Sequence, residues 1–413
     1  MIDLAISLAG CKIIEICNFV SGPMVGRNLA ALGAEVIKLE RPDGGDDGRY
    51  AHPSFDGEGL FFTETAYGKK SVVLDLKSQA GLATALKLID TADIVIENMR
   101  PSVMARIGLD PAMLVERNPT LIVASVSAFD PGSKRADDPA YDPVIQAATG
   151  VMFSTGFAGD PPRRVGASII DKTTALWSTI QILAALQQRE RTMRGGHITV
   201  SMLSAAVHMM GADILRYLAT GSDVAPSQPN AKGGGASHGA YRAKDGRWIQ
   251  IAVGNDRMYE RLCRAAGHEE LLSDPRFSTQ LLRGANRVEE NEAMTQVIGE
   301  RESNEWVSIL SEAKIPFALI NHISQFVADE ELSAPFMGTG VRSGGNEVPL
   351  VRGPLDPPDA PPAKRRVPKL GEDTEDILHA LGMSCTEIRE LTLAKAFGAK
   401  GIPATPELLR AGH

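Results

Sequence analysis

The chain has 413 residues, of which 43% are hydrophobic and 23% charged, and its formal net charge is −8. This length allows two domains, and the composition is that of an ordinary globular protein. The negative balance argues against wholesale binding to nucleic acid, so any anion site has to be a local cluster of arginine and lysine. There is no stretch of about 18 apolar residues that would span a membrane.

The four cysteines are scattered, with no CxxC pair and no pair of histidines near them. Free thiols in a reducing cytoplasm are therefore expected, and no metal site is predicted. The N-terminus has no basic residues ahead of its apolar ones, so it does not look like a secretory signal. We accordingly expect a cytoplasmic protein.

The first half of the chain alternates between strand and helix patterns. Short apolar runs rich in Ile and Val predict the strands, and apolar residues at three- and four-residue spacing predict the helices. Such alternation is typical of an α/β fold with a mostly parallel, Rossmann-like sheet, which binds ligands outside the carboxyl ends of its strands. The predicted strands are residues 12–16, 34–39, 71–76, 94–96, 121–127 and about 197–202, and the predicted helices include 21–32, 79–91 and 172–186.

The composition changes after residue 219, where Gly, Pro, Ser and Asn become frequent and indicate a linker. Beyond it, a hairpin turning at Asp245-Gly246 is expected to open a smaller domain. The predicted division is 1–220 for the large domain, 221–239 for the linker, 240–328 for a small α+β domain, 329–349 for a return segment, and 350–413 for a linker and a C-terminal segment that returns to the large domain.

Asp171 lies directly ahead of a long helix pattern, residues 172–186, that contains no Gly or Pro. An Asp in this place is expected to be the N-cap of the helix, its carboxylate held by free backbone N–H groups and by the positive end of the helix dipole. Taken alone, Asp171 would need no further role. The motifs around it give it one.

Several short motifs precede and follow Asp171 in a fixed order. They are Ser21-Gly22-Pro23 with LGAEVIKLERP (32–42), Leu74-Asp75-Leu76-Lys77, VIENMRP (95–101) and YDPVIQA (141–147), and, after Asp171, Arg194-Gly195-Gly196-His197. Each is weak alone, but the ordered set resembles the class III coenzyme A transferases, the family of formyl-CoA transferase and of the carnitine and bile-acid CoA enzymes. The resemblance runs from Lys12 to about Asp376. It implies a CoA-transferase with a Rossmann-like large domain, a smaller α+β domain and an interlocked homodimer.

Coenzyme A carries a 3′-phosphate and a diphosphate, so a site for it needs fixed positive charge. The resemblance places Arg41, Lys77 and Arg106 at CoA-binding positions, whereas Arg100 stands at a variable one. Each of these cations, taken singly, is also open to the plainer interpretation of a solvated surface charge. The other residues that the resemblance places along the CoA path are Val20, Ser21, Leu74, Asn98, Met99, Ile107 and Met202.

The resemblance also makes Asp171 the nucleophile. Aspartate is expected to be ionised at pH 7, because its unperturbed pKa is about 3.9, and it gains reactivity when it is held beside a bound thioester. Attack on an acyl-CoA implies an aspartyl-acyl anhydride and then an aspartyl-CoA thioester, from which CoA passes to a carboxylic acid. Tyr141 and Asp142 are expected to flank the thioester. No metal and no permanently bound cofactor are required.

Two positions depart from formyl-CoA transferase. Val20 stands where that enzyme has a glutamine lining the active site, and this removes a polar partner for a small acid such as oxalate. The tetraglycine loop is matched only loosely, by Gly233-Gly234-Gly235. That run is open to two interpretations, an active-site lid whose N–H groups face an oxyanion or a plain flexible linker.

Three other functions fit the sequence less well. α-Methylacyl-CoA racemases share the fold and the CoA site, but their two-base proton transfer needs a histidine where this chain has Tyr141, a poor base at pH 7. A CoA-binding protein without catalysis would not need an Asp at position 171. A nicotinamide oxidoreductase would need GxGxxG after the first strand, which residues 21–26 do not supply. CoA transfer is therefore the expected function, with donor and acceptor acids open and succinyl-CoA the first donor to try.

Overall fold

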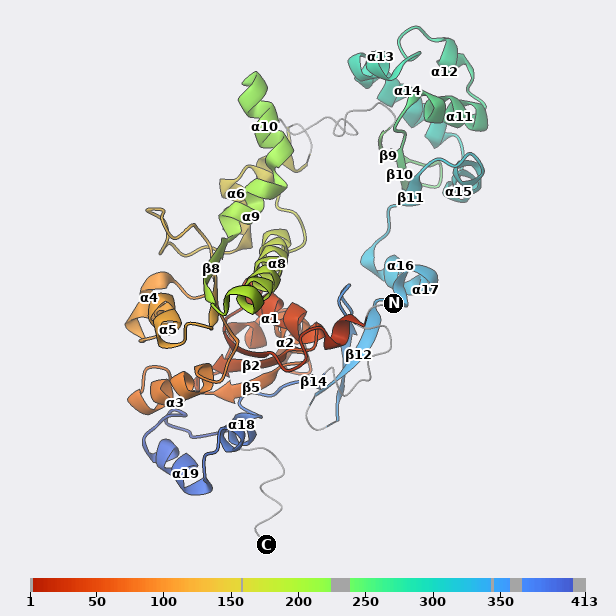
Figure 1. Cartoon of the computed structure of the whole chain (residues 1–413). Helices are drawn as coiled ribbons and strands as arrows, with labels where there is room; N and C mark the ends of the chain where they lie inside the picture. The colour runs from red at the N-terminus through yellow and green to blue at the C-terminus, as the bar shows by residue number, and fades with distance from the viewer. Residues whose placement is uncertain (1–2, 157–158, 224–237, 343–344, 357–365, 404–413) are drawn as a thin grey trace. The chain divides into compact units, whose positions relative to one another are not determined.

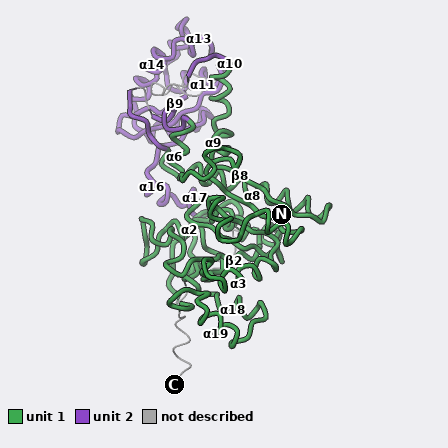
Figure 2. Tube along the Cα trace, turned by 90° about the vertical axis from the view of Figure 1, so that its left-hand side faces the viewer, with its two compact units in different colours: residues 1–149, 165–218, 335–413 green, residues 150–164, 219–334 purple. Residues whose placement is uncertain are grey.

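The computed structural model describes residues 3–156, 159–223, 238–342, 345–356 and 366–403 (Figure 1). These residues belong to two compact units, coloured separately in Figure 2. Unit 1 comprises residues 1–149, 165–218 and 335–413, and unit 2 comprises residues 150–164 and 219–334. Within the described ranges, no helix is long and apolar enough to cross a membrane.

A six-stranded sheet forms the centre of unit 1, in the order β5-β2-β1-β6-β7-β8. All five neighbouring pairs are parallel, which confirms the predicted α/β fold with a parallel sheet. The chain runs from β1 outward through β2 to β5 and then crosses back to β6, so the strand order reverses between β1 and β6. The bounds are β1 Lys12–Ile16, β2 Glu35–Glu40, β5 Lys70–Val73, β6 Ile94–Glu97, β7 Ile122–Ser127 and β8 Gly196–Ser201.

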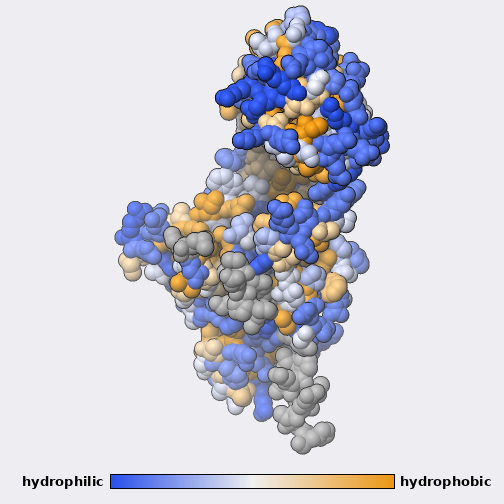
Figure 3. All heavy atoms as spheres, turned by 90° about the vertical axis from the view of Figure 1, so that its right-hand side faces the viewer, coloured by the Kyte–Doolittle hydropathy of each residue, from blue (hydrophilic) through white to orange (hydrophobic). Residues whose placement is uncertain are grey.

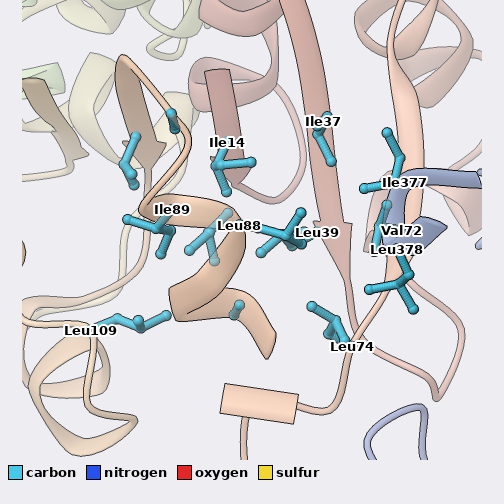
Figure 4. Packing of buried hydrophobic residues seen from close by; sticks show 14 of the residues in the cluster. Ile14, Ile37, Leu39, Val72, Leu74, Leu88, Ile89, Leu109, Ile377 and Leu378 are labelled. Carbon is cyan, nitrogen blue, oxygen red and sulfur yellow. The ribbon is translucent and has the colours of Figure 1, made fainter. Parts of the chain in front are cut away.

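Helices cover both faces of this sheet, because successive residues of a buried strand point to opposite faces. Ile14 packs with residues of α3, α18 and α19 on one face (Figure 4), whereas Ile13 packs with residues of α1 and α8 on the other. The first face also holds α4 and α5. The bounds are α1 Ser21–Ala31, α3 Gln79–Ile89, α4 Pro101–Arg106, α5 Pro111–Arg117, α8 Ile169–Thr192, α18 Thr374–Ala380 and α19 Cys385–Leu393.

Local chemistry sets the ends of the helices that follow β1 and β5. Ser78 caps α3 by accepting a hydrogen bond from Gly81 N at 3.0 Å. Gly33 ends α1 with a φ of +98°, and an added Cβ would lie 2.3 Å from the Ala5 carbonyl oxygen, so no larger residue fits there. These signals explain why the sequence pattern located both helices well.

The remaining elements of unit 1 are short. The chain after β13 is tied to the rest of unit 1 by Asp356, which accepts hydrogen bonds from Arg27 at 2.6 Å and from the Tyr67 hydroxyl at 2.7 Å. The bounds are η1 Leu4–Ile6, η2 Asp47–Tyr50, β3 Ser54–Phe55, β4 Glu58–Gly59, α2 Leu60–Ala66, α6 Asp142–Ala148, α9 Met202–Met209, α10 Gly211–Thr220, β12 Met337–Arg342, β13 Glu347–Val351 and β14 Arg366–Val367.

Unit 2 is a three-stranded antiparallel sheet with helices and its own core. β9 and β10 form the predicted hairpin around Asp245-Gly246, with Tyr241 opposite Ile249. Trp306 is fully buried at the centre of this core and donates to the Ile298 carbonyl at 2.8 Å. The bounds are α7 Val151–Ser154, β9 His238–Arg242, β10 Trp248–Ala252, α11 Asp256–Ala266, α12 Glu270–Ser273, α13 Gln280–Ala285, α14 Arg287–Gly299, α15 Ser303–Glu312, β11 Phe317–Leu319, α16 Ile323–Ala328 and α17 Glu330–Ser333.

Candidate active site

The carboxyl ends of β1, β2, β5 and β6 surround a cavity of about 500 Å³, which we call the strand-end cavity. Arg41 follows β2 and Lys77 follows β5, so both cations reach the cavity from the strand ends, as expected for a ligand site on a parallel sheet. The floor is apolar, with Ile16, Leu39 and Leu74. The cavity thus combines apolar surface with exposed positive charge.

A second cavity of about 330 Å³, the Asp171 cavity, lies next to the first one. The two are neighbours because Asn18, Met99 and Val103 line both of them. Asp171 and Tyr141 line the second cavity, and all of its lining residues belong to unit 1. A ligand with a charged and an uncharged end can therefore extend from one cavity into the other.

The sequence-predicted site residues fall into four groups. Two predicted residues, Asp142 and Arg106, line neither cavity, and the predicted glycine run at 233–235 lies outside the described residues. Those that line the strand-end cavity are Arg41, Leu74, Lys77, Met99 and Ile107. Those that line the Asp171 cavity are Val20, Ser21, Asn98, Met99, Arg100, Tyr141, Asp171 and Met202.

The loop after β1 separates the two cavities and is held by side-chain amides. Asn98 donates to the Asn18 carbonyl and accepts from the Asn18 N–H, both at 2.8 Å. Asn18 in turn donates to the Asp47 carboxylate at 2.8 Å and accepts from the Asp47 N–H at 2.9 Å. The next residue, Phe19, has a φ of +65°, a conformation that a non-glycine residue keeps only when its surroundings hold it. These hydrogen bonds hold the loop after β1 in one conformation between the two cavities.

Asn18 and Asp47 were not among the predicted site residues. The signal for Asn18 was available, because it follows β1 as Asn98 follows β6, and parallel neighbours end at the same edge of the sheet. Asp47 gives no such signal, since it lies in η2 between longer elements. Only the fold brings it beside Arg41.

Arg41 is paired with Asp47 and, through its Nε at 3.4 Å, with Asp43. The hydrogen bond to Asp47 raises the pKa of Arg41 above its usual value. The side chain of Arg41 is still 45% exposed. Because exposed pairs of this kind contribute little free energy, the guanidinium stays available to an anionic ligand.

A buried ionic network underlies the wall between the cavities. Lys38 Nζ lies 2.9 Å from Glu15 and 2.8 Å from Asp46, and Lys69 Nζ lies 2.5 Å from the other Glu15 oxygen. Burial by itself lowers the pKa of Lys38, but the Asp46 and Glu15 carboxylates outweigh it and hold that pKa above its usual value. Asp46 also accepts from Phe19 N–H at 3.0 Å, so the network supports the loop after β1.

Asp171 is the third residue of α8 and not its N-cap, which corrects the sequence prediction; the N-cap position belongs to Ser168. The side chain of Asp142 takes over the capping, since one of its oxygens accepts from Ile170 N–H at 2.7 Å and from Asp171 N–H at 3.1 Å. The prediction failed because the helix begins three residues before the predicted pattern of residues 172–186 does, and because its cap comes from another helix, α6.

The Asp171 carboxyl group does not have the ordinary acidity assumed from the sequence. Burial, and then the neighbouring Asp142 charge, raise its pKa to about 7, while Lys172 opposes them. A carboxylate with a raised pKa is a stronger base and a better nucleophile than a free aspartate. The site therefore presents a reactive carboxylate beside a cavity with exposed cations, an arrangement suited to attack on an acyl group.

Several known proteins are similar to this chain over most of its length. The succinate–glutarate CoA-transferase of Agrobacterium fabrum is 32% identical over 386 residues, covering 91% of this chain and 95% of its own length. The acetyl-CoA:oxalate CoA-transferase of Acetobacter aceti is 34% identical over 368 residues, covering 88% of this chain and 92% of its own. The crystal structure of a CAIB/BAIF family protein from Brucella suis superposes with a TM-score of 0.79 at 31% identity, covering 91% of this chain and 99% of its own.

The predicted family and type of activity are confirmed by these likenesses. Residues 8–374 match the family described as CoA-transferase family III. The match spans every strand of the large sheet and all residues that line the two cavities except Gly398 and Ala399. The protein therefore belongs to CoA-transferase family III and is an enzyme that acts on acyl-CoA and carboxylate substrates.

Proposed function

We propose that the enzyme moves coenzyme A from an acyl-CoA donor to a carboxylic acid through covalent intermediates on Asp171. The observation that carries this proposal is the position of Asp171, which lines a cavity that shares a wall with the cation-bearing strand-end cavity. A thioester bound there has its acyl carbon beside the carboxylate and its nucleotide over Arg41 and Lys77. Proximity then replaces a bimolecular encounter, which can lower the barrier by about 7–11 kcal/mol when the reacting atoms are aligned.

The proposed reaction has two exchanges that mirror each other. An Asp171 oxygen attacks the thioester carbonyl, the C–S bond breaks, and an aspartyl-acyl anhydride and CoA thiolate form. The thiolate attacks the aspartyl carbonyl of the anhydride, which releases the donor acid and leaves an aspartyl-CoA thioester. The acceptor carboxylate attacks this thioester, and the returning thiolate takes the acyl group from the second anhydride, which restores Asp171.

The exposed cations are assigned to the phosphates of CoA. Arg41 and Lys77 line the strand-end cavity and are our main candidates, and Arg106, in the last turn of α4, is assigned a weaker outer contact. Arg100 is the cation of the Asp171 cavity. The remaining predicted residues form the adenine and pantetheine path: Val20, Ser21, Leu74, Asn98, Met99, Ile107 and Met202.

The identity of the acids is proposed from the relatives alone. The names of the two similar enzymes give succinate and glutarate for one, and acetyl-CoA and oxalate for the other. We therefore propose small dicarboxylates as acceptors and succinyl-CoA or acetyl-CoA as donors. Thioester exchange followed by mass spectrometry, with a panel of acids against both donors, tests this assignment.

The covalent intermediate is tested directly. Wild-type protein incubated with acyl-CoA should gain the mass of CoA on the peptide that holds Asp171. Hydroxylamine should convert the adduct into a hydroxamate, and borohydride should reduce it to an alcohol. Asp171→Asn is the negative control. Active wild-type enzyme without a mass change on this peptide, together with an active Asp171→Asn variant, would rule the mechanism out.

The racemase alternative is tested in the same samples. Tyr141 lines the Asp171 cavity and is 63% exposed, and it stands where the two-base reaction of a racemase needs a histidine. We therefore expect no exchange of the α-hydrogen of a 2-methylacyl-CoA with deuterated water on the timescale of CoA transfer. Exchange at a comparable rate would contradict the proposed function.

We further propose that the protein is an interlocked homodimer. On α8, Leu176, Ile180 and Leu183 are exposed at a spacing that places them on one face. Single exposed hydrophobic residues are ordinary, and Figure 3 shows hydrophobic and hydrophilic residues mixed on one face of the molecule. Helix α10 is less ordinary, because none of its residues is buried. A partner chain would cover both. Sedimentation of a stable monomer at micromolar concentration would contradict the dimer.

A further inference from the structure

Asp142 is buried, with 5% of its surface exposed, and it does not line the Asp171 cavity. It starts α6, whereas the backbone groups that it binds belong to the first turn of α8. Its carboxylate therefore does not face the cavity that lies beside Asp171, although the sequence resemblance placed it beside the thioester. Its position suggests that it acts on Asp171 and not on the substrate.

The hydrogen bonds of Asp142 show which groups it holds. One oxygen accepts from Ile170 N–H at 2.7 Å and Asp171 N–H at 3.1 Å, two of the N–H groups that a helix leaves without an internal partner. A negative charge at this end of a helix is favoured by the helix dipole. Because the Asp171 N–H is itself bound, the direction in which the Asp171 side chain leaves the helix is fixed.

Gln146 holds the other oxygen of Asp142. The Gln146 amide donates to Asp142 and accepts from Val165 N–H at 2.9 Å, and its side chain is fully buried. The segment that leads into α8 is therefore connected to α6 at both of its ends. This small network contains no group that lines either cavity except Asp171.

Asp142 also acts on Asp171 through its charge. Its negative charge opposes ionisation of Asp171 and so raises the pKa of Asp171, whereas Lys172 lowers it. Lys172 is itself paired with Glu64 of α2 at 2.7 Å. The other charged or titratable groups that line the cavity are Asp47, Arg100, Asp138 and Tyr141. Asp142 differs from these four lining groups. It is buried, it is bonded to the first turn of α8, and it does not line the cavity.

We propose that Asp142 is a positioning residue, whose buried carboxylate fixes the first turn of α8 and whose charge sets the pH range in which Asp171 can attack. The inference rests on the proposed function, since it assumes that Asp171 is the nucleophile. It assigns to Asp142 two effects, one of geometry and one of charge. These effects are separable by mutation.

Asp142→Asn removes the charge and keeps a carbonyl oxygen for the two N–H groups, but its NH₂ group then faces the NH₂ group of Gln146. Two donors face each other there, which displaces the first turn of α8. We expect kcat to fall by up to about a hundredfold from misplacement of the nucleophile, with the KM for acyl-CoA unchanged. In the plot of kcat/KM against pH, the pH below which activity falls (the acid limb) should move down by about one unit, because a neighbouring like charge is gone. Glu64→Gln is the matched control: it removes a charge next to Lys172 without touching the N–H groups, and its acid limb and kcat should match wild type.

Gln146→Met separates geometry from charge and keeps the proposal testable if Asp142→Asn does not fold. It removes the donor to Asp142 without changing any charge, so kcat should fall while the acid limb stays in place. Wild-type kcat in Gln146→Met, or an acid limb below pH 5 in the wild-type enzyme, would overturn the inference. So would an Asp142→Asn variant with an unmoved limb, or one that changes only KM. Failure of the proposed function looks different, since Asp171→Asn would then remain active.

Discussion

The two neighbouring cavities use charge in opposite ways. Arg41 of the strand-end cavity is 45% exposed, and its partner Asp47, which lines the Asp171 cavity, is 40% exposed, so both charges remain in contact with water. In the Asp171 cavity the Asp171 carboxylate is partly buried and stands beside a buried one, Asp142. Exposed charges bind an anion without a large desolvation cost, whereas buried like charges raise the basicity of one of them. On the proposed mechanism, phosphate binding and nucleophilic attack therefore belong to two separate, neighbouring cavities.

The largest effect is expected at Asp171. Asp171→Asn keeps the size of the side chain but removes the attacking charge, so transfer should fall by about four orders of magnitude while CoA still binds. Asp171→Glu is the matched control for charge, and it should also be poor, since a displacement of about 1 Å costs about a hundredfold. Initial rates and isothermal titration with CoA measure both. If Asp171→Asn lost CoA affinity as strongly as it lost transfer rate, Asp171 would contribute to CoA binding, and the separate roles proposed for the two cavities would be wrong.

The same substitution should stabilise the fold above neutral pH. In the folded protein the pKa of Asp171 is about 7, which lies above the ordinary aspartate value of 3.8. At pH 8 the folded protein therefore holds a charged carboxylate that destabilises it relative to the unfolded chain. Below pH 3.8 the group is neutral in both states, and this destabilisation is absent. Asp171→Asn should therefore raise the free energy of unfolding at pH 8 by about 1–3 kcal/mol. The gain should shrink as the pH falls through 7. Urea unfolding at pH 8 and pH 5 measures the difference, and equal gains at both would contradict it.

Lys38 tests the ionic network beneath the cavities. Lys38→Met leaves Glu15 and Asp46 buried without this cation, and removing one partner of a buried pair costs about 3–5 kcal/mol. Lys70→Met is the matched control, because Lys70 on the neighbouring strand pairs with Glu35 at 43% and 37% exposure and should lose less than about 1 kcal/mol. Urea unfolding measures the free energy of unfolding of both variants. Similar losses in the two would mean that the burial of the Lys38 pairs does not add to their contribution to stability.

The pH profile of the wild-type enzyme reports the state of Asp171. Attack requires the ionised carboxylate, and its pKa is about 7. The kcat/KM for acyl-CoA should therefore fall about fiftyfold between pH 7 and pH 5, with a slope that approaches about tenfold per pH unit at the acid end.

Glu97 is the control for this assignment. Burial raises its pKa to about 7 as well, but it accepts from Met99 N–H and lines neither cavity. Glu97→Gln should keep the acid limb in place. A profile that stays flat down to pH 5 in the wild-type enzyme would mean that Asp171 ionises as an ordinary aspartate does.

The smallest effects are expected at the exposed cations. Arg41→Ala and Lys77→Ala should each raise the KM for acyl-CoA by about tenfold and leave kcat nearly unchanged, because they bind the ligand away from the reacting carbon. The penalty should shrink at high salt. Arg106→Ala should cost less than either, since Arg106 does not line the strand-end cavity. If a variant lost kcat at constant KM, the assignment of its cation to the phosphates of CoA would be wrong.

Several parts of the site could be predicted from the sequence because they depend on local patterns. The strand at Lys12–Ile16 was predicted to the residue, and Gly33 marked the end of α1 through its backbone conformation. Parallel strands place the residues at their carboxyl ends along one edge of the sheet, so Arg41 and Lys77 were expected there. The resemblance pointed to Asp171 by order along the chain.

Other parts were decided only by the tertiary structure. Asp171 and Asp142 are 29 residues apart, and nothing local indicates that one caps the helix of the other. The acidity of Asp171 could not be read from its residue type, because burial and a neighbouring charge, both long-range properties, set it. The network of Glu15, Lys38 and Asp46 is invisible in the sequence for the same reason. Sequence determines which groups leave each strand end; packing determines which of them meet, how far they are from water, and so how they react.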